Sequence, residues 1–186
     1  MDDTLLERVG VPTTKAAALR YLLECVEHGY CRHISGRLAP AKLPGFVAKM
    51  DERYAVLATR GARAYARERG RAAARLVLFP VDEADTGGEW FYFLLATDGA
   101  GPVHEQERLL DAREPGGRLV WLAHYRSPGW RPQYELVGRP VRSRSRGLIH
   151  RWTWRMAPAL YEQMRRWVEV GAGRARSSSD KNPARL

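Results

Sequence analysis

The chain has 186 residues, which is enough for one domain that buries its own core, and its Lys and Arg residues total 31 against 21 Asp and Glu. Two cysteines six positions apart cannot form a disulfide framework, so a reducing, cytoplasmic setting is expected. The chain opens with acidic residues and has no long apolar run, which argues against a signal segment, a membrane span or a membrane partner.

The first part of the chain is predicted to be mainly helical. Apolar residues recur with helical spacing over 14–28, and Gly29 ends this first helix. The alternating segment 30–38 predicts a strand. A second helix is expected to begin near Pro40 and continue through Tyr54, and a third runs from Thr59 to about Arg69.

Strands dominate the second part of the chain. Residues 74–80 and 89–99 are the clearest strands, and the acidic, glycine-bearing segment 81–88 predicts the loop of a hairpin. The following elements are a helix over 102–113, strands over 117–127, 133–141 and 151–156, and a helix over 157–170. Residues 171–186 lack apolar periodicity and predict a disordered basic tail after a single α+β domain over 1–170.

This order of elements contains a βαββαβ core, the ferredoxin-like arrangement, with an extra N-terminal helix, a C-terminal hairpin and a final helix. In that arrangement helices cover one face of the sheet, and the other face, on which RNA-recognition modules stack bases, is partly open. In outline the chain resembles small, basic ferredoxin-like proteins that bind or process RNA in bacterial ribonucleoproteins, including those of CRISPR type. No segment carries the signature of a named family.

The segment ECVEHGYCRHISG, residues 24–36, holds both cysteines and two histidines. A tetrahedral zinc site normally takes two pairs of ligands from segments that a loop separates, but here Gly29 and Tyr30 alone separate the pairs. No third residue is visible that would orient a Cys–His nucleophilic pair. We therefore expect Cys25, His28, Cys31 and His33 to be structural, with no metal and no cofactor.

Other catalytic motifs are also incomplete. His104 and Glu105 begin like a zinc-protease motif, but position 108 is Arg, so the second histidine ligand is missing. The sequence contains no phosphate-binding P-loop, no dinucleotide fingerprint and no serine-hydrolase elbow. Catalysis is therefore not expected from motifs of these kinds.

A first arginine array lies in the predicted third helix and just beyond it. Arg60, Arg63, Arg67 and Arg71 recur at spacings of three and four, which places them on one helix face at steps of about 5–6 Å, similar to the spacing of phosphates along a strand. Glu68 is the only acidic residue between 53 and 75. The alternative is a solvated charged face of no specific function.

A second array combines arginines with tryptophans. It consists of Arg139, Arg142, Arg144, Arg146, Arg151 and Arg155, interleaved with Trp152 and Trp154. On a strand the two tryptophans share one face, where they would form an exposed stacking platform for bases. The alternative is that both rings are core, packed under the last helix against Tyr161 and Met164.

Three hypotheses follow from these patterns. The favoured one is a non-catalytic protein that binds RNA or single-stranded DNA through Arg–phosphate contacts and base stacking, as a subunit of a bacterial ribonucleoprotein of CRISPR-like or mobile-element type with other protein subunits. The second is a metal-independent ribonuclease that uses His33, His104, His124 or His150 as general acid or base. The third is an interaction module whose basic surface docks an acidic protein.

Overall fold

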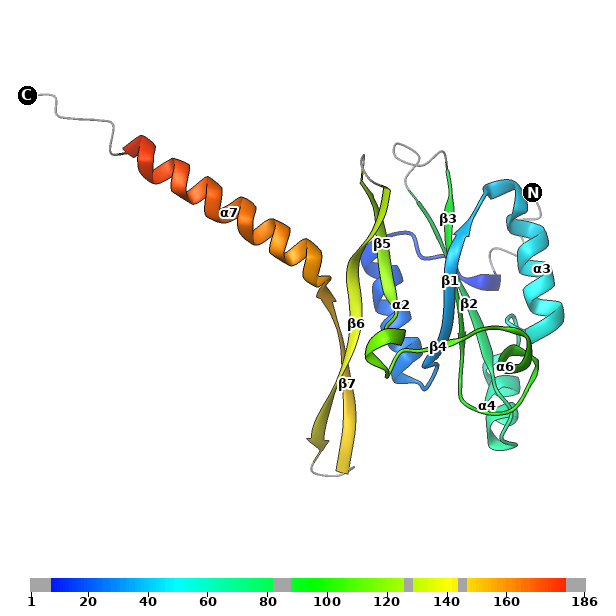
Figure 1. Ribbon diagram of the computed structural model, residues 1–186. Coiled ribbons are helices and arrows are strands. Elements are labelled where there is room, and N and C mark those ends of the chain that lie inside the picture. The colour runs from blue at the N-terminus through cyan, green and yellow to red at the C-terminus, as the bar shows by residue number, and fades with distance from the viewer. Residues whose placement is uncertain (1–7, 82–87, 126–128, 144–146, 180–186) are drawn as a thin grey trace, which may run out of the picture.

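The computed structural model of the protein describes residues 8–81, 88–125, 129–143 and 147–179 (Figure 1). Within these residues the architecture is mixed α+β, with two antiparallel sheets and five α-helices. The helices are α2 (Lys15–Glu27), α3 (Leu43–Tyr54), α4 (Arg60–Glu68), α6 (Pro102–Gln106) and α7 (Pro158–Ser179). Short 3-10 turns lie at Pro40–Lys42 and Pro115–Gly117.

The first sheet has four strands in the order β2-β3-β1-β4, and all neighbours are antiparallel. Its strands are β1 (Arg32–Leu38), β2 (Ala74–Pro80), β3 (Trp90–Ala96) and β4 (Leu110–Asp111). β2 and β3 form the hairpin that the sequence predicts, and β1 pairs with the other edge of β3.

The helix predicted over 102–113 is much shorter than expected. α6 ends at Gln106 because Glu107 adopts an extended backbone, with φ −115° and ψ 140°. The chain then pairs with β1 as β4, and the amide of Ala112 donates to the carbonyl oxygen of Cys31 over 2.8 Å. A free sheet edge and a following ion-pair network therefore override the helical pattern of this segment.

Both faces of the first sheet are buried, because β2 and β3 carry large apolar side chains on both sides. On one face, α3 and α6 cover the sheet with a cluster that includes Val47, Met50, Val103, Leu76 and Leu94. On the other face, a second cluster includes Val77, Phe91, Phe93 and Leu95. Leaving either face open would expose a large contiguous apolar patch.

The second face is covered by α2 and by the second sheet, which has the order β5-β6-β7 (Figure 1). Its strands are β5 (Val120–Tyr125), β6 (Gly129–Ser143) and β7 (Gly147–Met156). Trp121 on β5 packs directly on the first sheet, with its ring centroid 5.0 Å from Phe79, 5.5 Å from Phe91 and 5.9 Å from Phe93. The expectation of a partly open face for base stacking is therefore wrong.

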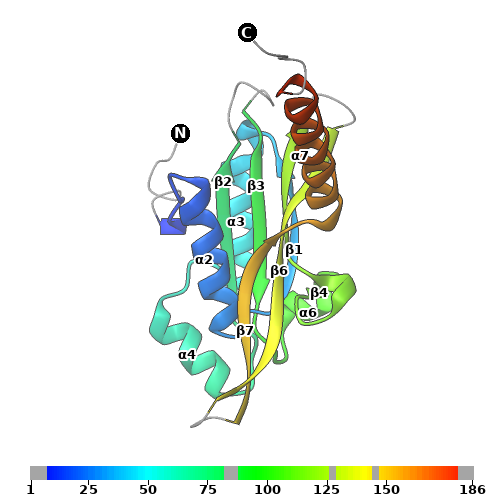
Figure 2. The ribbon, with the colours of Figure 1, turned by 90° about the vertical axis from the view of Figure 1, so that its left-hand side faces the viewer.

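α7 projects away from the rest of the molecule in Figure 1, and Figure 2 views the molecule from the side toward which it projects. It exposes a set of large apolar side chains, namely Tyr161, Met164, Trp167, Val168 and Val170. The helix continues to Ser179, so it includes residues 171–179, which the sequence assigned to a disordered tail. Residues 180–186 lie outside the described residues.

None of the described helices combines the length and apolar character needed to cross a membrane.

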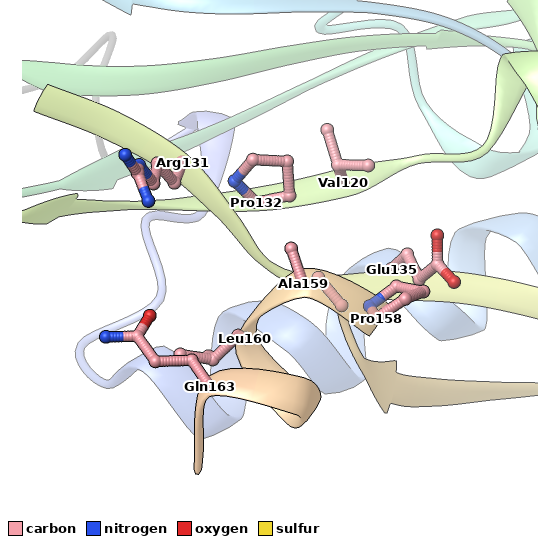
Figure 3. Close-up of a pocket in the computed structure, with 9 residues that line it drawn as sticks. Val120, Arg131, Pro132, Glu135, Pro158, Ala159, Leu160 and Gln163 are labelled. Atoms are coloured by element: carbon pink, nitrogen blue, oxygen red, sulfur yellow. The ribbon is translucent and has the colours of Figure 1, made fainter. Parts of the chain in front are cut away.

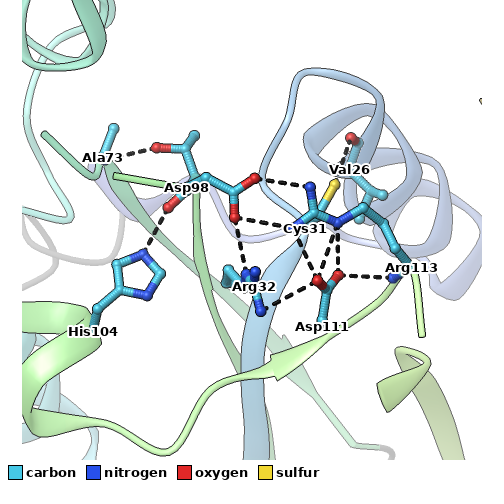
Figure 4. A network of polar contacts seen from close by, with 9 residues as sticks. Val26, Cys31, Arg32, Ala73, Asp98, His104, Asp111 and Arg113 are labelled. Atoms are coloured by element: carbon cyan, nitrogen blue, oxygen red, sulfur yellow. Dashed lines mark hydrogen bonds and ion pairs between the residues drawn. The ribbon is translucent and has the colours of Figure 1, made fainter. Parts of the chain in front are cut away.

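An ion-pair network fastens β4 to the centre of the first sheet (Figure 4). Arg113 donates to the carboxylates of both Asp98 and Asp111, with shortest distances of 2.8 Å. Arg32 on β1 bridges the same two carboxylates at 2.9 and 3.2 Å. Hydrogen bonds from Arg113, with help from Arg32, lower the pKa of Asp98 from 3.8 to about 2 against the opposing effect of burial.

His33 lies on β1 inside the protein, with 2% of its surface exposed. Its Nε2–H donates to the carbonyl oxygen of Gly117 over 2.7 Å, and Nδ1 is buried with no partner among the described residues. Burial lowers the pKa of His33 from 6.5, against the opposing effects of the Gly117 carbonyl and of Asp111. His33 is therefore a neutral structural residue of the folded protein at pH 7.

We expect Arg113→Ala to raise the pKa of Asp98 from about 2 toward 3.8, as measured by NMR titration of the carboxyl carbon. Because the folded pKa is depressed, Asp98 stabilises the protein above pH 3.8, and this contribution is lost as the pH falls toward 2. Arg118→Ala, which removes an arginine bound to Glu135 instead, should leave the pKa of Asp98 unchanged. An unchanged value in Arg113→Ala would contradict the network.

We expect His33→Gln to make the stability of the protein less sensitive to mild acid. The unfolded chain binds a proton at His33 near pH 6.5, whereas the folded chain does so at a lower pH, so stability falls as the pH drops below 6.5. Glutamine keeps a donor for Gly117 but cannot titrate. Below pH 6.5, the free energy of unfolding measured in urea should fall less steeply with pH in the variant than in the parent, by up to about 1.4 kcal/mol per pH unit. Identical slopes would place His33 in solvent.

Candidate nucleic-acid interface

Three arginines of the first array lie on one face of α4. Thr59 caps the helix, and its side-chain oxygen accepts a hydrogen bond from the amide of Ala62 over 3.2 Å. Arg67 donates from Nη1 to the carbonyl oxygen of His28, over 3.3 Å, which joins α4 to the end of α2. No residue of α4 is fully buried, so packing into the core does not account for this row of like charges.

Arg75 on β2 lies beside this row, although the sequence analysis did not group it with the array. Its guanidinium carbon lies 5.7 Å from the ring centroid of Tyr21 and 5.2 Å from that of Tyr30. Nη1 donates to the hydroxyl of Tyr21 over 3.1 Å and to Sγ of Cys25 over 3.7 Å. Burial acts to lower the pKa of Arg75, but these neighbours outweigh it and raise the pKa, so the group stays cationic.

These side chains surround a cavity of about 270 Å³, which we call the arginine pocket. It is lined by Glu24 and His28 of α2 and the following turn, Tyr30, Arg60, Arg63 and Arg67 of α4, and Arg75. Four guanidinium groups against the carboxylate of Glu24 give the lining residues a formal charge of +3, counting His28 as neutral. Across the described part of the chain, none of the four arginines forms an ion pair with a carboxylate.

Arg71 does not continue the row. α4 ends at Glu68, Gly70 has a φ of +69°, and Arg71 forms an isolated bridge with Ala100. Arg71 instead lines a different cavity of about 310 Å³, together with Arg53, Arg63 and Arg69. The prediction of four arginines on one helix face is therefore wrong at its last member, because the helix stops three residues earlier.

The second array is divided between the two faces of the β6–β7 hairpin. Arg139 and Arg151 are exposed and directly opposite one another across the strands, where like charges repel. Arg142 is also exposed, and strand alternation places it on the opposite face, the one that carries Trp152. Arg155 is bound to the carboxylate of Glu135, as is Arg118. Arg144 and Arg146 lie outside the described residues.

Trp152 and Trp154 are not an exposed platform. Trp152 is 7% exposed and belongs to the core cluster between the two sheets. Its ring lies against Gly138, where an added Cβ would be 3.0 Å from the ring. Trp154 is partly buried, and its Nε1–H donates to the carbonyl oxygen of Leu19 over 2.8 Å. Both rings therefore pack toward α2, whereas the alternative from sequence placed them under the last helix.

The residues of the Cys/His cluster have separate partners. Cys25 and Cys31 are both buried, and burial raises the pKa of each thiol. Sγ of Cys31 lies 3.7 Å from the carbonyl oxygen of Val26. Nδ1 of His28 donates to the carbonyl oxygen of Glu24 over 2.7 Å, which orients its ring at the edge of the arginine pocket. Protonated, buried thiols are poor nucleophiles and poor metal ligands.

Of the other three candidate histidines, the structure describes the side chain of His104 alone. Nε2 of His104 donates to the carbonyl oxygen of Thr97 over 2.8 Å (Figure 4), which is a structural hydrogen bond like that of His33. The side chains of His124 and His150 lie outside the described residues. Within the described ranges, no group of three or more His, Cys, Asp or Glu residues is placed to hold a metal ion.

A larger cavity of about 570 Å³ lies between the second sheet and the first turns of α7 (Figure 3). Its lining is mainly apolar, with Val120, Pro132, Ala159 and Leu160 among its residues. Figure 3 shows Arg131 and Glu135 on opposite sides of it. The carboxylate of Glu135 is already bound by Arg118 and Arg155, so this cavity lacks the convergent free charge of the arginine pocket.

Comparison with known proteins does not assign the site, because no protein-family model, no curated protein and no solved structure matches this chain. The assignment of a function to the arginine pocket therefore depends on its own geometry and charge.

We expect Trp152→Ala to lower the free energy of unfolding by about 3–5 kcal/mol, because it leaves a cavity between β7 and α2. Trp154→Phe should cost about 1 kcal/mol, because the hydrogen bond to Leu19 is lost. Urea unfolding monitored by circular dichroism measures both changes.

The matched control is Trp167→Ala, since Trp167 is 76% exposed on α7. Its stability should stay within about 0.5 kcal/mol of the parent. A Trp152→Ala variant as stable as this control would place the Trp152 ring outside the core.

Proposed function

We propose that this protein binds RNA or single-stranded DNA, without catalysing a reaction on it, as a subunit of a bacterial ribonucleoprotein complex. The observation that carries the proposal is the arginine pocket, where four guanidinium groups converge without carboxylate partners among the described residues. Guanidinium binds phosphate oxygens with a bidentate fork, and the anion relieves the repulsion within the row on α4.

The β6–β7 hairpin supports a binding surface larger than the pocket. Both views place α4 and the far end of this hairpin at the same end of the molecule (Figures 1 and 2). The hairpin adds exposed Arg139, Arg142 and Arg151, and none of these is ion-paired within the described residues. A strand whose phosphate lies in the pocket would extend toward the hairpin. Because Trp152 and Trp154 are packed toward α2, the proposal depends on phosphate contacts rather than on base stacking.

We also propose that the first sheet is a ferredoxin-like βαββαβ unit. The order β2-β3-β1-β4 with antiparallel neighbours supports this assignment, as does the position of α3 and α6 together on one face. The second half of the unit is abbreviated, since α6 has five residues and β4 has two. The face that RNA-recognition modules use is covered, so the arginine pocket at the sheet's end replaces it as the proposed interface.

The exposed apolar side chains of α7 support the part of the proposal that concerns other protein subunits. Trp167 is 76% exposed and Val168 is 59% exposed on a helix that projects from the body (Figure 1). Such residues are usually covered in an assembly.

Two alternative functions have less support. For a metal-independent ribonuclease, the described candidates His33 and His104 each use Nε2 to donate to a backbone carbonyl, so that nitrogen is not available for acid–base chemistry. For an acidic protein partner, the pocket is too small to admit a peptide segment, although carboxylates could reach its rim. Incubation of labelled RNA with a chelator tests the first alternative, and competition by polyglutamate tests the second.

We expect the affinity for a labelled single strand to fall linearly with salt on logarithmic axes, because bound phosphates release counterions. The slope should be shallower by roughly 1 to 1.5 in an Arg63→Ala, Arg67→Ala double variant, since each lost phosphate contact removes about 0.7. Fluorescence anisotropy from low to moderate salt measures this slope.

The control for this experiment is an Arg108→Ala, Arg165→Ala double variant, which changes the net charge equally but alters exposed arginines outside the pocket. Its slope should equal that of the parent. Equal slopes in both double variants would mean that α4 is a solvated face, and the proposed interface would then be abandoned.

A further inference from the structure

We propose that the arginine pocket binds a terminal phosphate monoester of a nucleic-acid strand, rather than a phosphodiester within the strand. This inference rests on the proposed nucleic-acid binding and specifies which group of the strand enters the pocket.

The charge of the pocket matches a dianion better than a monoanion. A phosphodiester carries one negative charge and two non-bridging oxygens, whereas a terminal monoester carries about −1.5 to −2 at pH 7 and three acceptor oxygens. The four guanidinium groups and Glu24 give a formal charge of +3. A single phosphodiester would leave most of this positive charge uncompensated. The third acceptor oxygen of a monoester can also accept hydrogen bonds that a diester cannot.

The size and the walls of the pocket also favour the end of a strand. Its volume of about 270 Å³ is below the range of roughly 300–1,000 Å³ that is usual for small-molecule sites, so it admits a phosphate with part of a sugar. The hydrogen bond from Arg67 to the carbonyl of His28 joins α4 to the end of α2 beside the pocket. A continuous strand needs an entrance and an exit, whereas a strand end needs an entrance alone.

Three of the four arginines of the pocket make hydrogen bonds within the protein before any ligand binds. Arg75 is fixed between Tyr21 and Tyr30 and by its hydrogen bond to Tyr21. Arg63 donates from Nη1 to the carbonyl oxygen of Ala58. The Nε–H of Arg75 is buried, and no described residue accepts a hydrogen bond from it. Preorganised charges of this kind reward a compact, highly charged ligand more than a flexible backbone.

The test uses one oligonucleotide sequence, labelled internally, in four forms: with a 5′-phosphate, with a 3′-phosphate, with hydroxyls at both ends, and circularised. Fluorescence anisotropy at constant salt gives the four affinities. We expect a form with a terminal phosphate to bind about tenfold more tightly than the form with two hydroxyls, because the monoester adds charge-assisted hydrogen bonds. The form that gains affinity identifies whether the pocket accepts the 5′ or the 3′ end. This preference should shrink as the pH is lowered through about 6, where the monoester gains a proton.

Two variants connect the preference to the pocket. Arg75→Gln should remove the preference for the phosphorylated form while the form with two hydroxyls loses less affinity. Because Arg75 is partly buried and its replacement can affect folding, Arg60→Ala serves as a second variant, since Arg60 is exposed at the rim. It should reduce the preference several-fold. Arg108→Ala, outside the pocket, should retain it fully.

The outcomes separate this inference from the proposed function. Equal affinity for all four forms would overturn the terminal-phosphate inference and leave nucleic-acid binding standing. Failure to bind any form would overturn the proposed function itself. A terminal preference that persists in both pocket variants would place the phosphate elsewhere on the protein and would also overturn the inference.

Discussion

The structure depends on the need to bury both faces of one small antiparallel sheet. β2 and β3 present large apolar side chains on each side, and burial of such side chains is the dominant favourable contribution to folding. α3 and α6 satisfy one face, and α2 with the second sheet satisfies the other. Trp121, which contacts Phe79, Phe91 and Phe93, joins the second sheet to the first. The placement of the remaining elements follows from this double covering.

The arginine pocket is a consequence of this covering. Because α2 lies on the second face of the sheet, its C-terminal end comes beside Arg75 of β2, and α4 then contacts the same end of α2 through Arg67. Arginines from two separate segments, α4 and β2, thus bring their positive charges together beside the end of α2 at the edge of the core. Elsewhere, arginines such as Arg32, Arg113 and Arg155 are neutralised by carboxylates. The pocket differs from those sites because, among the described residues, none of its arginines forms an ion pair with a carboxylate, which is why its charge is available to an anion.

The candidate site could be predicted in part. Arg60, Arg63 and Arg67 were found by their helical spacing, which depends on local geometry that the sequence specifies. Arg75 was missed, although an arginine inside the apolar strand ARLVLFP is a usable signal, since a charge is rarely placed in a buried strand without a partner. The tryptophan platform was wrong because alternation along a strand reveals that two rings share a face but not what covers that face. Arg155 shows the same limitation, since its partner Glu135 is 20 residues away in sequence.

The sequence by itself determined the local elements, namely the helices from Lys15, Leu43 and Arg60 and the β2–β3 hairpin. These follow from short-range periodicity, from caps such as Thr14 and Thr59, and from glycines that end helices. Tertiary structure alone decided that α6 ends early so that β4 can pair with β1, that the second sheet covers the first, and that Arg75 joins the arginines of α4. Each of these outcomes depends on contacts between residues that are far apart in the chain. A local sequence pattern does not show which of those residues will meet or how strongly they will interact.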